Sequence, residues 1–110
     1  MELFVRGDVV VVPFPFNNLS DQKMRPALVL ADLAGPDLIL CQITSKPARD
    51  RYSVTVDAPD FSEGSLKYTS NVRANQIFTL EKTLIRNCVG RLKKEKTEQV
   101  VQVVISFLRS

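Results

Sequence analysis

Two short polar stretches hold the side chains best suited to act on a phosphate. Arg25 follows the polar segment 17–23 and directly precedes Pro26, which pushes the residue before it toward extended geometry. At the mouth of a strand, its planar guanidinium can donate two hydrogen bonds to one phosphate. Residues 44–46 (TSK) follow an apolar run and offer two hydroxyls and an ammonium to a phosphodiester. Each stretch alone also fits ordinary surface or strand-end chemistry.

The composition limits the remaining chemistry. The chain has 110 residues, no histidine and two cysteines. Histidine-based acid–base catalysis, a Ser-His-Asp triad and a histidine metal site are therefore excluded. Without a CxxC pair or a tight carboxylate cluster, we expect no metal and no cofactor. Cys41 and Cys88 are expected to be small buried hydrophobic residues in a reducing compartment.

Length and charge indicate the class of protein and of partner. We expect one domain over residues 1–110. No apolar stretch approaches the ~20 residues that span a bilayer, and the charged N-terminus is unlike a signal peptide, so we expect a cytoplasmic protein without membrane contact. The net charge is +3, and residues 61–110 hold nine Lys and Arg against four Asp and Glu. A basic half favours a nucleic-acid partner, although a solvated basic surface would carry the same charge.

The elements that must position these side chains are mostly strands. Segments 17–23 and 58–70 are expected to be loops, and 34–37 a tight turn. Helical spacing of apolar residues predicts an amphipathic helix over about 94–108, whose surplus apolar surface at Val103 and Ile105 faces either a partner subunit or the chain's own sheet. Five or six strands before a helix predict a mainly β fold, a small barrel-like sheet with a C-terminal helix. The predicted strands are 9–12, 26–31, 38–44, 51–56, 72–80 and 89–92.

The order of these segments resembles the MazF/PemK toxins of bacterial toxin–antitoxin systems. The likeness covers nearly the whole chain and is carried by RGDVVVVPFPF, KMRPALVL, LILCQITSK, GSLKYTSNVRANQIFTL and the helix after VGRL. It implies an SH3-like barrel, related to that of CcdB-like toxins, which forms a homodimer. It also implies a sequence-specific, metal-independent endoribonuclease that cleaves single-stranded RNA, including mRNA. A cognate antitoxin, whose disordered tail fills the RNA groove, would inhibit the toxin and could carry the complex to DNA.

The resemblance also assigns roles to individual residues. Arg25 matches the family's catalytic arginine and Thr44 its catalytic threonine. One departure is Lys93, which stands at the expected helix N-cap where Ser or Asp is preferred. The positions that match RNA contacts are Asn17, Ser20, Asp21, Gln22 and Lys23 in a loop over the RNA, and Ser45, Lys46, Ser70, Asn75 and Gln76 elsewhere.

RNA carries its own nucleophile, the 2′-hydroxyl, which explains how a histidine-free chain could cut it. Arg25 would stabilise the phosphate and Thr44 would hold it in line, giving a 2′,3′-cyclic phosphate and a 5′-hydroxyl. Arginine already carries its proton at neutral pH and so cannot accept the 2′-proton. Asp21 is either the base that accepts it or a turn residue. Phe16 is either a stacking platform for a base or a core residue. The alternatives are a non-enzymatic toxin that binds DNA gyrase and an inactive nucleic-acid-binding SH3-like module.

Overall fold

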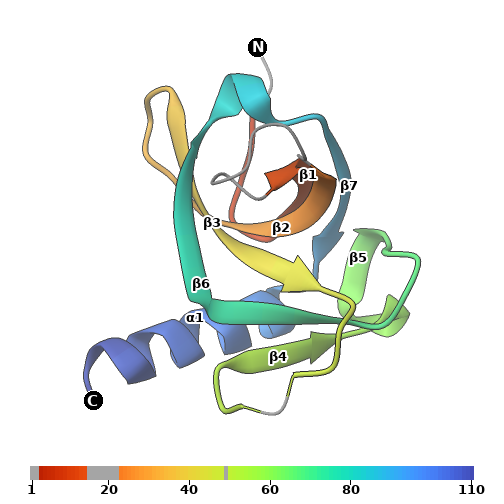
Figure 1. Cartoon of the computed structure of the whole chain (residues 1–110), viewed down its shortest axis with the longest axis vertical. Helices are drawn as coiled ribbons and strands as arrows, with labels where there is room; N and C mark the ends of the chain where they lie inside the picture. Colours follow the sequence, from red (N-terminus) through yellow and green to blue (C-terminus); the bar gives the residue numbers. More distant parts are fainter. Residues whose placement is uncertain (1–2, 15–22, 49) are drawn as a thin grey trace.

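The computed structural model describes residues 3–14, 23–48 and 50–110 (Figure 1). The predictions made for Phe16, Asn17, Ser20, Asp21 and Gln22 lie outside these residues. Within the described ranges the chain forms seven strands, two short 3-10 helices and one α-helix. In chain order they are β1 (Asp8–Phe14), β2 (Lys23–Asp32), β3 (Asp37–Thr44), β4 (Ser53–Val56), η2 (Ala58–Asp60), β5 (Phe61–Gly64), β6 (Ser70–Glu81), η3 (Lys82–Leu84), β7 (Asn87–Leu92) and α1 (Lys94–Leu108).

The strands form one antiparallel sheet in the order β4-β6-β3-β2-β1-β7-β5. The sheet curls around β1 and β2, and α1 lies outside it against β6 and β4 (Figure 1). This arrangement confirms the predicted mainly β class, with a barrel-like sheet and a C-terminal helix. The turn expected at 34–37 also connects β2 to β3 as predicted.

The expected loop 58–70 is wrong in its first half, which contains η2 and β5, a strand in addition to the six that the sequence predicts. This strand has one apolar anchor, Phe61, and therefore lacks the alternation that marks a strand in the sequence. It pairs with β7 because two glycines permit close approach. Gly64 has φ +61°, and a Cβ there would lie 2.1 Å from the Val89 carbonyl oxygen; a Cβ at Gly90 would lie 2.6 Å from the Glu63 carbonyl oxygen.

The sheet buries apolar side chains on both faces, so its central strands read as continuous apolar runs. Val9 belongs to one core cluster, with Leu28, and α1 covers this cluster through Val100. Val10 and Ala27 belong to a second cluster on the other face of the same strands. Alternate residues of β1 and β2 thus enter different cores, and both strands are fixed in register.

Helix α1 begins at Lys94, as predicted, although the Lys93 side chain forms no capping bond. Its first turn is held by η2, because the Lys93 N–H donates to the Asp60 carbonyl at 2.8 Å and Lys96 lies 3.7 Å from the Asp60 carboxylate. Packing against the sheet buries Val100, whereas Leu108 remains exposed. In the described chain no helix is long and apolar enough to cross a membrane.

Burial was predicted for both cysteines, and the structure confirms it for one of them. Cys41 is buried in the first core cluster, which confirms its expected role, and burial raises the pKa of its thiol to about 12. Cys88 is exposed, so its predicted burial is wrong. A register shift between β1 and β7 pairs Val9 with Gly90 and Val10 with Cys88, and it is Val89 that packs on the core.

Candidate active site

The register of β2 and β3 brings Arg25 and Thr44 to the same end of the sheet. Ala27 of β2 pairs with Gln42 of β3. Arg25 lies two residues before Ala27 and Thr44 two residues after Gln42, and because the strands are antiparallel both lie beyond this pair on the same side. Because side chains alternate with a period of two, both occupy equivalent positions beyond this pair. The two residues that the sequence analysis assigned to catalysis are therefore neighbours across two strands.

Arg25 and Thr44 line two adjoining cavities that share them and Ile43. We call these cavities together the groove. One has a volume of about 380 Å³ and the other about 210 Å³. The larger is lined by Phe14, Arg25, Gln42, Ile43, Thr44, Lys46, Pro47 and Arg73, and the smaller by Arg25, Pro26, Ile43, Thr44, Ser45, Leu66, Lys67, Tyr68 and Ser70.

The Thr44 hydroxyl is oriented by the turn that follows it. Its Oγ1 accepts a hydrogen bond from the Lys46 N–H at 3.1 Å, which leaves the hydroxyl proton for donation to an oxygen in the groove. The Lys46 carbonyl in turn accepts from Asn71 Nδ2 at 3.0 Å, and Asn71 Oδ1 accepts from the Thr55 hydroxyl at 2.9 Å. This chain of bonds ties the turn to β6 and β4 and so fixes the donor.

The Arg25 guanidinium is available to an anion. Arg25 lies within β2, opposite Val12 of β1, in the extended geometry predicted from Pro26. The side chain is exposed, and among the described residues it forms no ion pair. Its charge is thus not neutralised by a described carboxylate, as binding of a phosphate requires.

Arg73 is a third cation of the larger cavity, beside Arg25 and Lys46, and sequence reasoning missed it. Its guanidinium is held by Asp50, with 2.9 Å between Nη2 and Oδ2. Its Nε is buried and has no hydrogen-bond partner within the described chain. The signal in the sequence is weak, because an arginine between Val72 and Ala74 reads as an ordinary outward-facing strand residue.

The other predicted RNA contacts differ in where the structure places them. Ser45 and Lys46 are exposed and line the groove, whereas Lys23 is exposed at the start of β2. Ser70 lines the smaller cavity but is only 4% exposed, and its hydroxyl donates to the Tyr68 carbonyl at 2.9 Å. Each of these contacts stays a prediction.

The structure does not bring Asn75 and Gln76 to either cavity of the groove. Both are exposed in a segment where β6 loses its pairing with β3, between the pairs Cys41–Ile77 and Gln42–Arg73. Their contact with RNA also stays a prediction.

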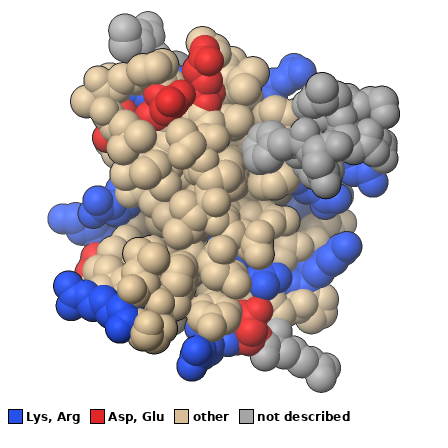
Figure 2. All heavy atoms as spheres, turned by 60° about the vertical axis from the view of Figure 1, so that its left-hand side comes forward, with Lys and Arg blue, Asp and Glu red and all other residues tan. Residues whose placement is uncertain are grey.

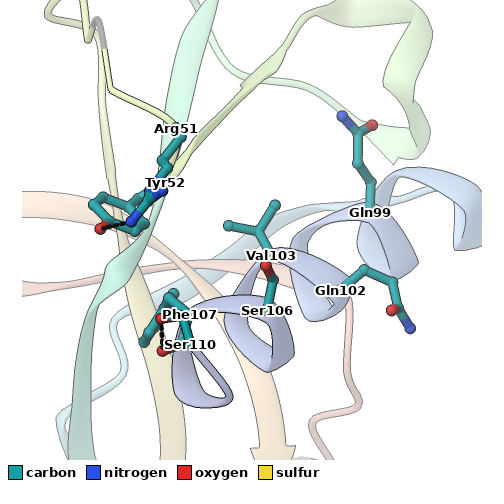
Figure 3. Close-up of a pocket in the computed structure, with 8 residues that line it drawn as sticks. All are labelled: Arg51, Tyr52, Gln99, Gln102, Val103, Ser106, Phe107 and Ser110. Carbon is teal, nitrogen blue, oxygen red and sulfur yellow. Dashed lines mark hydrogen bonds between the residues drawn. The ribbon is translucent and has the colours of Figure 1, made fainter.

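A third cavity, of about 360 Å³, lies away from the groove between α1 and the start of β4 (Figure 3). Tyr52 meets Phe107 edge-on there, with ring centroids 5.7 Å apart, and Arg51 lies over the Tyr52 ring. Figure 3 shows Val103 and Ser106 on the helix side facing these rings. The lining of this cavity combines Val103 and the rings of Tyr52 and Phe107 with polar side chains of α1, and Arg51 is the one cation among the described residues that line it.

Comparison with known proteins identifies the family. The model of the PemK-like, MazF-like toxins of type II toxin–antitoxin systems matches residues 5–108, and the chain belongs to this family. No curated protein sequence matches the chain.

Solved structures share the fold. MazF from Deinococcus radiodurans is 22% identical, with a TM-score of 0.79 and all of both chains covered. An endoribonuclease from a mycobacterial species, solved in complex with its cognate antitoxin, is 16% identical, with a TM-score of 0.78, covering 97% of this chain and 96% of that one. A MazE–MazF complex from D. radiodurans is 22% identical, with a TM-score of 0.77 and 94% of both chains covered.

Proposed function

We propose that this toxin is a sequence-specific endoribonuclease that cuts single-stranded RNA, including mRNA, without a metal ion. The observation that carries the proposal is the position of Arg25 and Thr44, which come from neighbouring strands and line the same two cavities. Family membership and the endoribonuclease named among the structural neighbours support the same reaction.

The proposed reaction uses the 2′-hydroxyl of the RNA as nucleophile. The 2′-oxygen bonds to phosphorus, the bond from phosphorus to the 5′-oxygen breaks, and the products are a 2′,3′-cyclic phosphate and a 5′-hydroxyl. Thr44 donates a hydrogen bond from its hydroxyl to a non-bridging oxygen, and the Arg25 fork stabilises the charge that accumulates on the phosphate. Arg25 also protonates the leaving 5′-oxygen, and it regains a proton from water before the next turnover.

The group that accepts the 2′-proton must come from elsewhere. No Asp or Glu is among the described residues that line the groove. Asp21 stays the proposed base, in the segment outside the described residues. Lys46 adds positive charge to the groove and favours binding of the RNA backbone, whereas the charge of Arg73 is paired with Asp50.

The decisive test is to incubate the purified protein with a long RNA in EDTA and map both ends of every product. We expect cuts at a short recurring sequence, with cyclic phosphate and 5′-hydroxyl ends. Replacing the 2′-hydroxyl with hydrogen at a mapped site should abolish cleavage there. Undiminished cutting of that deoxy substrate would refute the chemistry, and the absence of any cleavage would refute the nuclease assignment.

We further propose a cognate antitoxin as the inhibitory partner. Antitoxin complexes among the structural neighbours support this partner, and the cationic groove offers a site for its disordered tail. A complex that binds DNA through the antitoxin, and a cytoplasmic location for the toxin, belong to the same proposal.

A homodimer completes the proposal. Figure 2, which turns the left-hand side of Figure 1 toward the viewer, shows a face with an uncharged centre, Lys and Arg side chains along its border, and Asp and Glu side chains near its upper and lower ends. Exposed apolar residues on α1 and β6, namely Ile105, Leu108 and Ile77, are the surface that a second copy would cover. Light scattering at micromolar concentration should give twice the mass of the chain, and a monomer would contradict this part.

A further inference from the structure

The connection between β5 and β6, residues 65–69, presents an aromatic ring at one end of the groove. Tyr68 lines the smaller cavity together with Arg25 and Thr44, yet 62% of its surface is exposed. The other described ring of the groove, that of Phe14, packs edge-on against Phe78 with centroids 4.9 Å apart. Among the described residues of the groove, Tyr68 is therefore the ring that offers its surface to a ligand.

The backbone around Tyr68 is anchored on both sides. Leu66 packs against the first core cluster, and the Ser65 hydroxyl donates to the Leu66 carbonyl at 2.9 Å. On the other side the buried Ser70 hydroxyl donates to the Tyr68 carbonyl at 2.9 Å. A ring on an anchored segment loses little conformational freedom when a ligand packs on it, which favours binding.

A cation accompanies the ring. The Lys67 ammonium lies 5.4 Å from the centroid of Tyr68, at cation–π distance, and Lys67 lines the same cavity. An aromatic face combined with positive charge is the arrangement that holds single-stranded nucleic acids, in which bases stack on the ring and phosphates meet the cation.

We propose that Tyr68 stacks on one base that flanks the cleaved bond, and that Lys67 neutralises the adjoining phosphate. The inference rests on the proposed function for its substrate, single-stranded RNA, and adds a nucleotide subsite to the groove. Since every base has a π-face, the stacking contributes affinity rather than base selection. The contact exists before and during the reaction, so its loss raises KM and leaves kcat nearly unchanged.

The test compares Tyr68→Ala with Tyr68→Phe and with Leu33→Ala, which truncates an exposed apolar side chain in the turn between β2 and β3. With an RNA that holds a mapped cleavage site, Tyr68→Ala should raise KM about 5- to 100-fold. Tyr68→Phe and Leu33→Ala should stay within about twofold of the wild type. Thermal unfolding of each variant shows whether the fold is retained.

An abasic scan identifies the stacked base. Each nucleotide near the cut is replaced in turn by an abasic one. At one position the wild type should lose as much affinity as Tyr68→Ala does, and Tyr68→Ala should lose nothing more. If KM is unchanged in Tyr68→Ala, or if no abasic position shows this coupling, the inference is wrong while the nuclease assignment stands.

A binding measurement separates the inference from the chemistry. Fluorescence anisotropy gives the Kd of a single strand of the same sequence that is 2′-deoxy throughout and cannot be cut. If the wild type binds this strand, Tyr68→Ala binds it about 5- to 100-fold more weakly and RNA is not cleaved, the subsite is supported and the nuclease assignment fails. Equal binding by the two proteins overturns the subsite.

Discussion

Replacing Arg25 and Thr44 singly and together tests whether the two side chains act on one phosphate. Arg25→Ala removes the guanidinium, and Thr44→Val removes the hydroxyl while keeping a β-branched shape. Loss of one group that stabilises developing charge lowers kcat by about 10²- to 10³-fold. Independent effects would multiply to roughly 10⁴- to 10⁶-fold in the double variant.

The structure argues against such multiplication. Both side chains line the same two cavities from paired strands, so both should contact the same phosphoryl group. When one contact is lost, the phosphate is no longer held in line and the other contact contributes less. We therefore expect the double variant to lose about 10³-fold, close to the more damaging single change.

Stability should not explain these losses. Arg25 is exposed and forms no ion pair in the described chain, so Arg25→Ala should change the free energy of unfolding by less than about 0.5 kcal/mol. Thr44→Val removes the acceptor for the Lys46 N–H, a contact on the surface worth about 1 kcal/mol. Urea unfolding measures both.

The assay is kcat and KM for a fluorogenic RNA that holds one mapped cleavage site. Thr44→Ser retains the hydroxyl and should keep most of the rate, and Arg25→Lys keeps the charge without the fork and should fall between wild type and Arg25→Ala. A double variant as slow as the product of the two single losses would refute a shared phosphate. Near-normal turnover of Arg25→Ala would remove Arg25 from the mechanism.

Three further predictions concern stability and the thiols. Asp8 is buried and accepts hydrogen bonds from Arg91 Nε at 2.8 Å and from the Val5 N–H at 2.9 Å. Asp8→Ala should therefore lower the free energy of unfolding, measured by urea unfolding, by about 3 kcal/mol. A decrease below about 0.5 kcal/mol would contradict this. Iodoacetamide should alkylate Cys88 in the native protein, and Cys41 only after unfolding, as mass spectrometry can show. Burial raises the Cys41 pKa from 9.0 to about 12, so the contribution of its neutral thiol to the free energy of unfolding is complete below pH 9 and is lost between pH 9 and 12. The decrease in the free energy of unfolding over this pH range should be smaller in Cys41→Ala.

The central strands and the helix could be predicted because their signals are local. Strands β1 and β2 are buried on both faces, and the runs at 9–12 and 26–31 record that burial directly. Helix α1 shows its period from Thr97 onward, so its bounds were found despite the poor cap at Lys93. By contrast, β5 depends on glycines that let it approach β7, a contact between residues 26 to 31 positions apart in the chain that no local pattern encodes.

The site was predictable for Arg25 and less so for its surroundings. Pro26 restricts Arg25 locally and Thr44 ends an apolar strand, so neighbouring residues mark both as candidate phosphate ligands, and the resemblance to MazF/PemK toxins supplies their catalytic roles. Whether the two meet depends on the pairing of β2 with β3, which the order of segments only suggests. The tyrosine of the β5–β6 connection lay in an expected loop, where exposure and direction cannot be derived from the sequence.

Arg73 shows most clearly why part of the groove was hidden. Leu40 pairs with Phe78 and Cys41 with Ile77, and an unbroken register would set Gln42 opposite position 76, but a shift in β6 sets it opposite Arg73 instead. The three intervening residues, 74–76, leave the ladder, and the groove receives a guanidinium where a regular strand would supply an amide. The same shift explains why Asn75 and Gln76 lie outside the cavities. A bulge of this kind is set by packing on both faces of the sheet, so the charge of the groove is a property of the fold and not of any single segment.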